Sequence, residues 1–263
     1  FDFVVIATPP QNHLQFVKIC SERRWPFFCE FNLLTKDTIA IAKLVKKNKL
    51  IGIPSNTGEY DNDTSLLAKF IGISKGYFTF HLAQNIHDWH PWEKKGKYFI
   101  YRPESSALRE ILRVELPWIL KLFGALRSVS VNSRSIFAKK YGINDLLFLR
   151  LEFTSGVVGE LIFDVISPIV IKKFIFVSDH KTVIWDEPLN QITVGGKGKR
   201  ERKNLNKKTI LPDYKFKEDA HLPEMKNALA VVGKKQRQFF YFKDEINLLR
   251  LIDKIEKLAL SKI

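Results

Sequence analysis

A short apolar run near the start of the chain constrains the possible folds most strongly. Residues 3–7 read FVVIA, and the run ends at Thr8-Pro9-Pro10. A strand that is apolar and β-branched throughout is typical of a parallel sheet with both faces covered, because a half-exposed strand alternates polar and apolar residues. The chain is therefore expected to contain a parallel sheet with helices on both faces.

The segments after this run alternate between helix and strand patterns. Helical spacing of apolar residues indicates helices at 12–22 and 36–47, and the runs at 25–30 and 50–54 indicate strands. The order β-α-β-α-β with short links predicts a parallel sheet. Because the first strand would then be an exposed edge, we expect further strands of the sheet to precede this sequence.

The rest of the chain has a different pattern. A strand is expected at 77–86, a long apolar helix at 105–123, and closing helices at about 217–232 and 244–261. Closely spaced strand patterns follow the long helix, at 126–133, 146–153, 157–165, 170–177, 182–186 and 191–194. Turn residues between some of these strands suggest hairpins. The predicted fold is thus an α/β half-domain at 1–56, followed at 57–263 by an α+β domain with an open-faced, mainly antiparallel sheet and helices on one face.

The basic charge of the chain is uneven. The formal net charge is +15, and seven basic residues against one Glu fall between Gly195 and Lys208. No nucleic-acid-binding motif accompanies them, so we interpret this stretch as a solvated basic surface on a mobile loop. Binding of nucleic acid or another polyanion through residues 197–208 is kept as a minor hypothesis.

Composition excludes several classes of protein. The chain of 263 residues is 45% hydrophobic, which suits a folded core. No apolar run is long enough for a membrane span, and the first residues do not resemble a secretion signal. Cys20 and Cys29 are the two cysteines, and neither belongs to a C-x-x-C motif. We therefore expect two buried thiols and a reducing, cytoplasmic location.

Several motifs resemble the glucose–fructose oxidoreductase/inositol dehydrogenase (Gfo/Idh/MocA) family. The first is D-F-V-V-I-A-T-P-P-x-x-H at residues 2–13, followed by Cys29-Glu30. Softer matches are W-H-P-W-E at 89–93, R-E-I at 109–111, E-L-P-W at 115–118 and G-E-L-x-F-D at 159–164. The resemblance covers nearly the whole chain.

The resemblance implies a Rossmann domain, of which 1–56 would be the C-terminal half, and a substrate and dimerisation domain at 57–263. It implies NAD or NADP at the carboxyl ends of the parallel strands and a sugar-like substrate between the domains. A homo-oligomer through the sheet domain is also implied. The residues that it implies for the cofactor are Thr8, Pro9, His13 and Glu30, and those for the substrate are Trp89, His90, Trp92, Glu93 and Arg109.

The chain departs from the family at the positions of its chemistry. The lysine of the family's E-K-P motif is replaced by Phe31, and the Asp and His four residues apart match Glu110 and Val114. Neither Phe nor Val transfers a proton. Glu110 is the one catalytic residue that we assign, with Arg113 and Glu115 as nearby polar alternatives.

The phosphate-binding turn of dinucleotide sites is also not found. No G-x-G-x-x-G occurs in the sequence, and Gly195-Gly196-Lys197-Gly198 does not follow a β-α unit. We therefore expect this chain to be an N-terminally truncated and divergent relative, inactive as it stands, whose complete form is an oxidoreductase acting on a sugar or sugar-nucleotide hydroxyl. The alternative is a non-catalytic paralogue that retains the sheet domain for sugar binding or dimerisation.

The segment around residue 90 admits two interpretations. Trp89 and Trp92 could stack on a sugar ring while His90 or Glu93 bonds its hydroxyls, or both indoles could be core residues under a loop. His81, His87, His90 and Glu93 lie close in sequence, but their spacing matches no common zinc pattern. We therefore predict no metal site.

Overall fold

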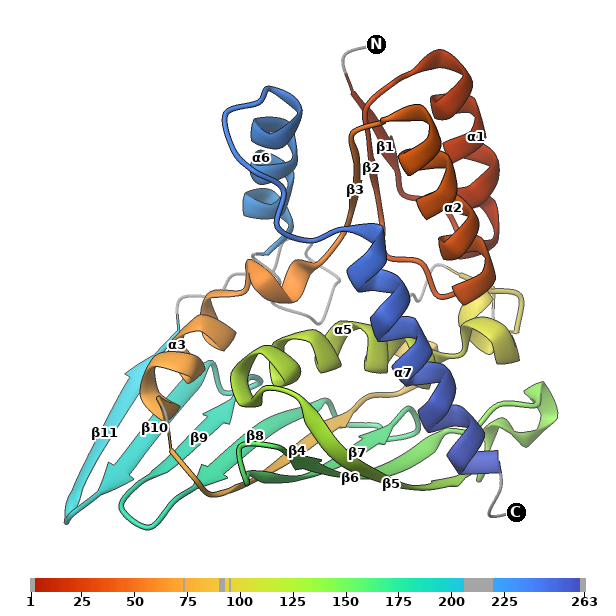
Figure 1. Ribbon diagram of the computed structural model, residues 1–263. Helices are drawn as coiled ribbons and strands as arrows, with labels where there is room; N and C mark the ends of the chain where they lie inside the picture. The colour runs from red at the N-terminus through yellow and green to blue at the C-terminus, as the bar shows by residue number, and fades with distance from the viewer. Residues whose placement is uncertain (1–2, 73, 90–92, 95, 206–219, 261–263) are drawn as a thin grey trace.

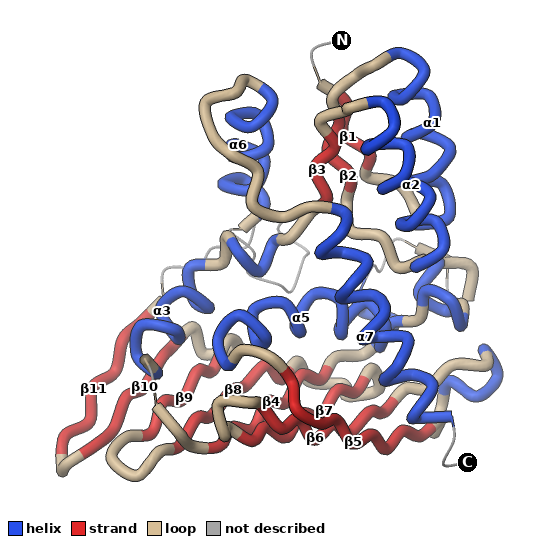
Figure 2. Tube along the Cα trace, viewed as in Figure 1, coloured by secondary structure: helices blue, strands red, loops and turns tan. Residues whose placement is uncertain are grey.

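The computed structural model describes residues 3–72, 74–89, 93–94, 96–205 and 220–260. Two sheets organise them (Figures 1 and 2). The small sheet has the order β1-β2-β3 and the large sheet the order β11-β10-β9-β8-β4-β7-β6-β5. No described helix combines the length and the apolar character needed to cross a membrane.

The small sheet is parallel, as predicted. Its strands are β1 (Val4–Ile6), β2 (Phe27–Cys29) and β3 (Gly52–Pro54), connected by α1 (His13–Arg23) and α2 (Thr35–Asn48). Within the described residues β1 pairs with β2 on one side only, and Val5 is 49% exposed. The three carboxyl ends therefore lie at one edge, which faces the large sheet (Figure 1).

Both faces of the small sheet are covered, but by segments from opposite ends of the chain. Helices α1 and α2 pack on one face through Val17 and Ile41. The other face receives α6 (His221–Val232), whose Ala228 and Val231 pack against Phe28 and Ile53. The division of the chain into 1–56 and 57–263 stays a prediction. Helix α6 belongs to the second of these segments but packs on the sheet formed by the first.

The large sheet is mixed rather than purely antiparallel. Its eight strands are β4 (Tyr77–Ala83), β5 (Leu126–Arg134), β6 (Leu146–Phe153), β7 (Val158–Asp164), β8 (Ile171–Val177), β9 (Thr182–Asp186), β10 (Gln191–Gly196) and β11 (Lys199–Asn204). All neighbours are antiparallel except β4 and β7. Strand β4 lies between β7 and β8, parallel to β7 and antiparallel to β8.

The prediction of a mobile basic loop was wrong for residues 199–204. They form edge strand β11, which continues from β10 through a turn in which Lys197 (φ 48°) and Gly198 (φ 75°) have left-handed backbone. Every residue of β11 is exposed. Charged side chains on an edge strand discourage pairing with another sheet, which is a structural use for this basic run. Residues 206–208 lie outside the described residues.

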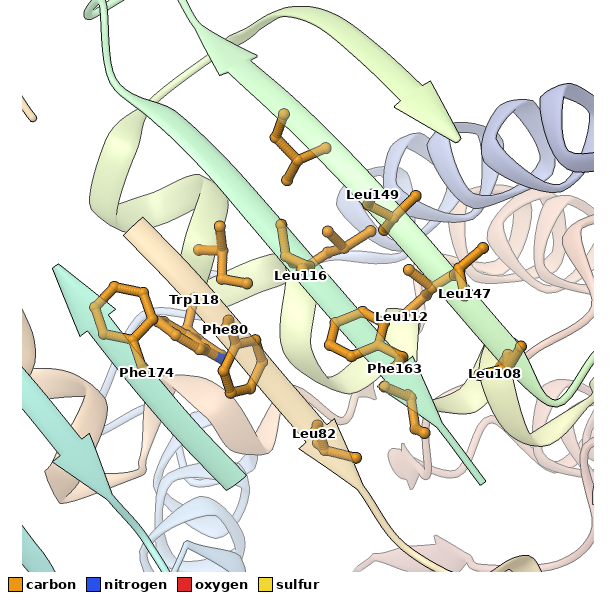
Figure 3. Packing of buried hydrophobic residues seen from close by; sticks show 14 of the residues in the cluster. Phe80, Leu82, Leu108, Leu112, Leu116, Trp118, Leu147, Leu149, Phe163 and Phe174 are labelled. Atoms are coloured by element: carbon orange, nitrogen blue, oxygen red, sulfur yellow. The ribbon is translucent and has the colours of Figure 1, made fainter. Parts of the chain in front are cut away.

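Helices cover one face of the large sheet. They are α3 (Asn62–Ile71), which the sequence analysis missed, α5 (Ala107–Phe123) and α7 (Phe242–Leu260), while the short α4 (Ile86–Trp89) follows β4. Figure 3 shows Trp118 of α5 against Phe80 and Phe174 of the sheet, and Leu112 of α5 beside Phe163 and Leu147. The opposite face carries Tyr77 and Phe148, 53% and 40% exposed.

Candidate active site

A cavity of about 340 Å³ lies where the carboxyl ends of β1 and β2 meet α5 and the large sheet. Its lining includes most of the residues that the sequence singled out: Thr8, Pro9, His13, Glu30, Phe31, Glu93, Glu110 and Val114. Ligands of open parallel sheets bind at this edge, because loops diverge there and leave a crevice. The structure thus brings these residues together in one cavity. The sequence alone could not show how the segments that form its walls pack against one another.

The turn after β1 contributes two buried polar atoms, the Thr8 hydroxyl oxygen and His13 Nδ1, that have no hydrogen-bond partner among the described residues. The His13 ring is 1% exposed, and its Nε2 donates to the Thr8 carbonyl oxygen at 2.6 Å. Burial lowers the pKa of His13, against smaller contributions from that hydrogen bond and from Asp37. The ring is therefore neutral, with an acceptor lone pair on Nδ1. This Nδ1 and the Thr8 hydroxyl are buried, and neither has a hydrogen-bond partner among the described residues.

The segment after β2 brings Glu30 and Phe31 to the cavity. Glu30 continues the ladder, since its amide donates to the Ile6 carbonyl at 2.9 Å. The Phe31 ring lies 5.5 Å from the guanidinium carbon of Arg113, and Phe240 lies at 5.6 Å from the same carbon. Phe31 stands where the family that the sequence resembles has its lysine. Here its ring contacts the buried guanidinium of Arg113.

Helix α5 supplies the wall that faces the parallel strands. It begins at Ser106, whose hydroxyl accepts from the Arg109 amide at 3.3 Å, a normal cap for a helix start. Glu110 and Val114 are one turn apart and both line the cavity. Glu110 is 9% exposed. It is therefore a carboxyl group that a substrate in the cavity would touch, while Val114 offers only apolar contact.

The floor of the cavity comes from the large sheet, and the sequence analysis missed it. Gln84 follows β4 and Lys172 lies in β8, far apart in sequence, and both line the cavity. Lys172 Nζ pairs with Glu115 Oε1 at 2.8 Å, and Glu115 Oε2 accepts from Trp118 Nε1 at 2.8 Å. Only the pairing of β4 with β8 brings these residues together, and no local pattern indicates it.

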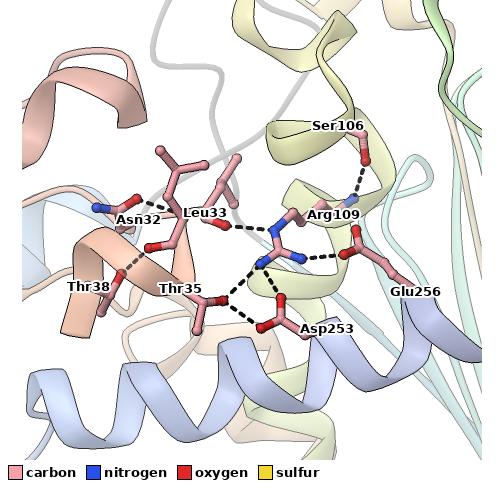
Figure 4. A network of polar contacts seen from close by, with 9 residues as sticks. Asn32, Leu33, Thr35, Thr38, Ser106, Arg109, Asp253 and Glu256 are labelled. Atoms are coloured by element: carbon pink, nitrogen blue, oxygen red, sulfur yellow. Dashed lines mark hydrogen bonds and ion pairs between the residues drawn. The ribbon is translucent and has the colours of Figure 1, made fainter. Parts of the chain in front are cut away.

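Arg109 lies outside the cavity. Its guanidinium donates to the Leu33 carbonyl at 2.6 Å and to Asp253 at 2.7 Å, and it also pairs with Glu256 (Figure 4). At 4% exposure it joins α5, α7 and the segment before α2. This place favours a structural role over the substrate contact that the resemblance implied.

Arg113 is likewise engaged within the protein. It donates to Glu245 Oε1 of α7 at 2.8 Å and to the Ser55 carbonyl after β3 at 2.8 Å. Both side chains are buried, at 2% and 0%. Burial raises the pKa of Glu245, and the Arg113 charge opposes that rise. The pair links the large domain to the end of the small sheet rather than entering the cavity.

The segment around residue 90 is only partly described. Glu93 lines the cavity and Trp89 ends α4, whereas His90 and Trp92 lie outside the described residues. His87 Nδ1 bonds the Tyr101 hydroxyl at 2.6 Å, and His81 Nε2 is 3.2 Å from Asp164. In the part of the chain that the structure describes, no three His, Cys, Asp or Glu side chains gather as metal ligands would.

His221, another residue that the sequence analysis missed, enters the cavity from the start of α6. Its neighbour Glu224 accepts from the Ser55 hydroxyl at 3.0 Å and from the Asn56 amide at 2.5 Å. Glu224 is 4% exposed and ties α6 to the turn after β3. The cavity wall thus includes a helix that follows all strands in the sequence.

No protein-family model matches the sequence, and no curated protein matches it. Solved structures do match the fold. The UDP-N-acetylglucosamine 3-dehydrogenase of Acidithiobacillus ferrooxidans has a TM-score of 0.75 at 14% identity, over 98% of this chain and 78% of that one. An aldose–aldose oxidoreductase from Caulobacter crescentus, complexed with glycerol, has a TM-score of 0.78 at 13% identity, over 100% and 78%.

A third match adds a cofactor complex. An inositol dehydrogenase homologue from Azotobacter vinelandii, complexed with NAD+, has a TM-score of 0.76 at 12% identity, over 98% of this chain and 76% of that one. At such identities the likeness concerns the fold. A small parallel sheet followed by a large mixed sheet is the arrangement that the sequence motifs implied, and this chain has the fold of the Gfo/Idh/MocA oxidoreductases.

Proposed function

We propose that the protein is an NAD- or NADP-dependent oxidoreductase that acts on a hydroxyl group of a sugar or sugar nucleotide. The observation that carries the proposal is one cavity lined by the carboxyl ends of β1 and β2, where a nicotinamide would lie, and by Glu110 of α5. The matched structures support this class, since they include a sugar-nucleotide dehydrogenase and an aldose–aldose oxidoreductase.

The residues after β1 fit the nicotinamide end of such a cofactor. The Thr8 hydroxyl and His13 Nδ1 are buried polar atoms without a partner among the described residues, and a bound ligand would satisfy them. Glu30 lines the cavity from the next strand. The glycine-rich turn for the diphosphate is not in the sequence, so the proposed contacts concern the nicotinamide and its ribose alone. Matched structures contain NAD+ or NADP+.

The chemistry assigned to the chain is proton transfer and positioning. A bound nicotinamide would accept the hydride from the alcohol carbon or return it to a carbonyl carbon. Glu110 takes the hydroxyl proton during oxidation and returns it during reduction, because of the two α5 carboxyl groups in the cavity wall it is the one at the position matching the family's acidic residue, whereas Glu115 is paired with Lys172. Phe31 and Val114 close the cavity and exclude water.

Fluorescence titration with NADH and NADPH tests the proposal. We expect a saturable change with one or both cofactors, weakened at least several-fold by Thr8→Val, which removes one hydroxyl without changing shape. Turnover is then assayed with glucose, myo-inositol and UDP-N-acetylglucosamine, and Glu110→Gln should abolish it while leaving cofactor affinity intact. A flat titration up to millimolar cofactor would contradict the proposal and favour a non-catalytic role.

The non-catalytic alternative has its own supporting observation. The open face of the large sheet exposes Tyr77 and Phe148, and Ile162 lies opposite Phe148 across the strands. Apolar side chains exposed on an open sheet face favour association. We propose that this face forms a homo-oligomer, with or without catalysis. A dimer that binds neither cofactor would support the paralogue.

A further inference from the structure

Gln84 is a buried side chain with an amide nitrogen that the described residues leave unpaired. It is 2% exposed and lines the cavity, and its Nε2 has no hydrogen-bond partner among the described residues. Its backbone is held in place, because the amide donates to the Asp164 carbonyl at 3.1 Å. Buried amide groups are almost always paired, so an unpaired one in a cavity wall points to a ligand.

Lys172 lies beside Gln84 on the same face of the sheet. Its register partner across β4 and β8 is Leu82, which also lines the cavity. Side chains two residues apart on a strand share a face, so Gln84 is a diagonal neighbour of Lys172. Both therefore present N–H groups to the cavity from its floor.

The charge of Lys172 is fixed by its surroundings. Burial alone would lower its pKa, but the Glu115 carboxylate at 2.8 Å outweighs burial and the pKa is raised. The ammonium group is therefore protonated at any physiological pH. Glu115 occupies one of its three donors, which leaves others for a ligand. Such a group holds an oxygen atom and does not exchange protons with it.

The charges of the described cavity lining disfavour a carboxylate on the sugar ring. Among the described residues, four carboxyl groups line it (Glu30, Glu93, Glu110 and Glu115), against one ammonium, that of Lys172. Donors on the floor and carboxyl acceptors elsewhere match a hydroxyl-rich molecule, whose groups both donate and accept. A carboxylate on the same ring would meet like charge.

We propose that Gln84 and Lys172 together bind one hydroxyl or carbonyl oxygen of the substrate, and that the sugar ring held there is uncharged rather than a uronic acid. Lys172 then supplies a positive charge to the cavity, where position 31 holds an aromatic ring. If this oxygen belongs to the reacting carbon, Lys172 stabilises the negative charge that grows on it during hydride transfer, while the proton goes to Glu110. The inference rests on the proposed function for the identity of the ligand as a substrate.

Ligand-observed NMR with glucose, myo-inositol and glucuronate tests the inference without turnover. We expect the wild-type protein to bind at least one neutral sugar, and glucuronate at least tenfold more weakly than glucose. Gln84→Met keeps the side-chain length and removes the donor, so it should weaken neutral-sugar binding about tenfold. Because the lost donor has no partner, its melting temperature should stay unchanged or rise, which a structural glutamine would not show.

Two further variants complete the test. Lys172→Met combined with Glu115→Gln removes the ion pair without leaving one charge buried, and it should also weaken sugar binding. Gln191→Met, at the distant strand β10, is the matched control and should bind as the wild type does. The inference is overturned if Gln84→Met binds sugar normally or melts lower, if glucuronate binds as well as glucose, or if no neutral sugar binds. Cofactor titration is a separate measurement. If the Gln84 and Lys172 variants bind sugar normally while the wild type binds the cofactor, this inference is wrong and the proposed function is not affected.

Discussion

The ring of Phe31 lies 5.5 Å from the guanidinium carbon of Arg113, at the position where related folds are expected to carry a lysine. Arg113 is in turn bonded to the buried Glu245. A phenylalanine here is therefore a packing partner of a buried cation and contributes roughly 0.5–2 kcal/mol through the cation–π contact. The aromatic residue at position 31 is thus coupled to the ion pair that joins α5 and α7.

This relationship predicts that restoring the lysine harms the protein. Phe31→Lys removes the aromatic contact and brings a second cation close to Arg113. We expect a lower melting temperature and no gain in oxidoreductase activity. Phe31→Tyr, which keeps the ring, is the control and should behave as the wild type. A stable and more active lysine variant would show that Arg113 does not depend on the ring.

We predict that breaking the buried Arg113–Glu245 pair lowers the free energy of unfolding more than breaking an exposed ion pair does. Arg113→Met leaves a buried carboxyl group without its cation, which costs about 3–5 kcal/mol of unfolding free energy. Arg150→Met breaks an exposed pair with Glu152 at 3.6 Å and should cost less than about 1 kcal/mol. Urea denaturation of both variants measures the difference. Equal losses would contradict the assignment of a buried pair.

Gly159 is predicted to tolerate no side chain. A Cβ atom there would lie 2.1 Å from the Phe78 ring, which stacks on Phe123 with centroids 4.7 Å apart. We expect Gly159→Ala to destabilise the fold by about 1–3 kcal/mol or more, because the ring is fixed by its neighbours. Gly58→Ala, whose nearest contact would be an ordinary 3.7 Å, serves as the control. Thermal unfolding of both variants checks the prediction.

His13 is predicted to make the fold sensitive to acid. Burial lowers its folded-state pKa below the ordinary 6.5, so the unfolded chain binds a proton more readily. Its contribution to stability is complete above pH 6.5 and is lost as the pH falls through the folded-state pKa, with a slope of up to about 1.4 kcal/mol per pH unit. His13→Gln should lose this slope below pH 6.5. Parallel slopes for the two proteins would contradict a buried neutral imidazole.

The open sheet face is predicted to mediate association. Phe148→Glu places a charge on that face, where Phe148 is 40% exposed, and should shift a dimer to monomer in sedimentation velocity. Phe137→Glu, at a 71% exposed position away from the sheet face, is the control. A wild-type monomer at micromolar concentration would remove the basis for the proposed oligomer.

Most of the local structure was predictable because it follows from periodicity. The strands 146–153 and 182–186 agree with the observed bounds, and the parallel order of the first three strands follows from their apolar runs. The parallel pairing of β4 with β7 was not predictable, since it depends on contacts distant in sequence. Strand β11 was missed because its residues are uniformly polar and have no alternating pattern.

The cavity was predictable on one side only. Thr8, His13 and Glu30 follow strands, so local patterns place them at that edge, whereas Glu110 was assigned through the resemblance to the family. No local sequence pattern marks Gln84 and Lys172, because they come close in space only through the pairing of β4 with β8. Arg109 shows the opposite case: its motif suggested a ligand, but carboxylates of α7 already surround it.

The covering of the small sheet by α6 has a consequence for biosynthesis. Phe28 and Ile53 are synthesised long before Ala228 and Val231, which shield them from water. Domains commonly fold in the order in which they are made. Here one face of the small parallel sheet stays open until α6 has been synthesised, so completion of this sheet depends on a helix that follows all the described strands.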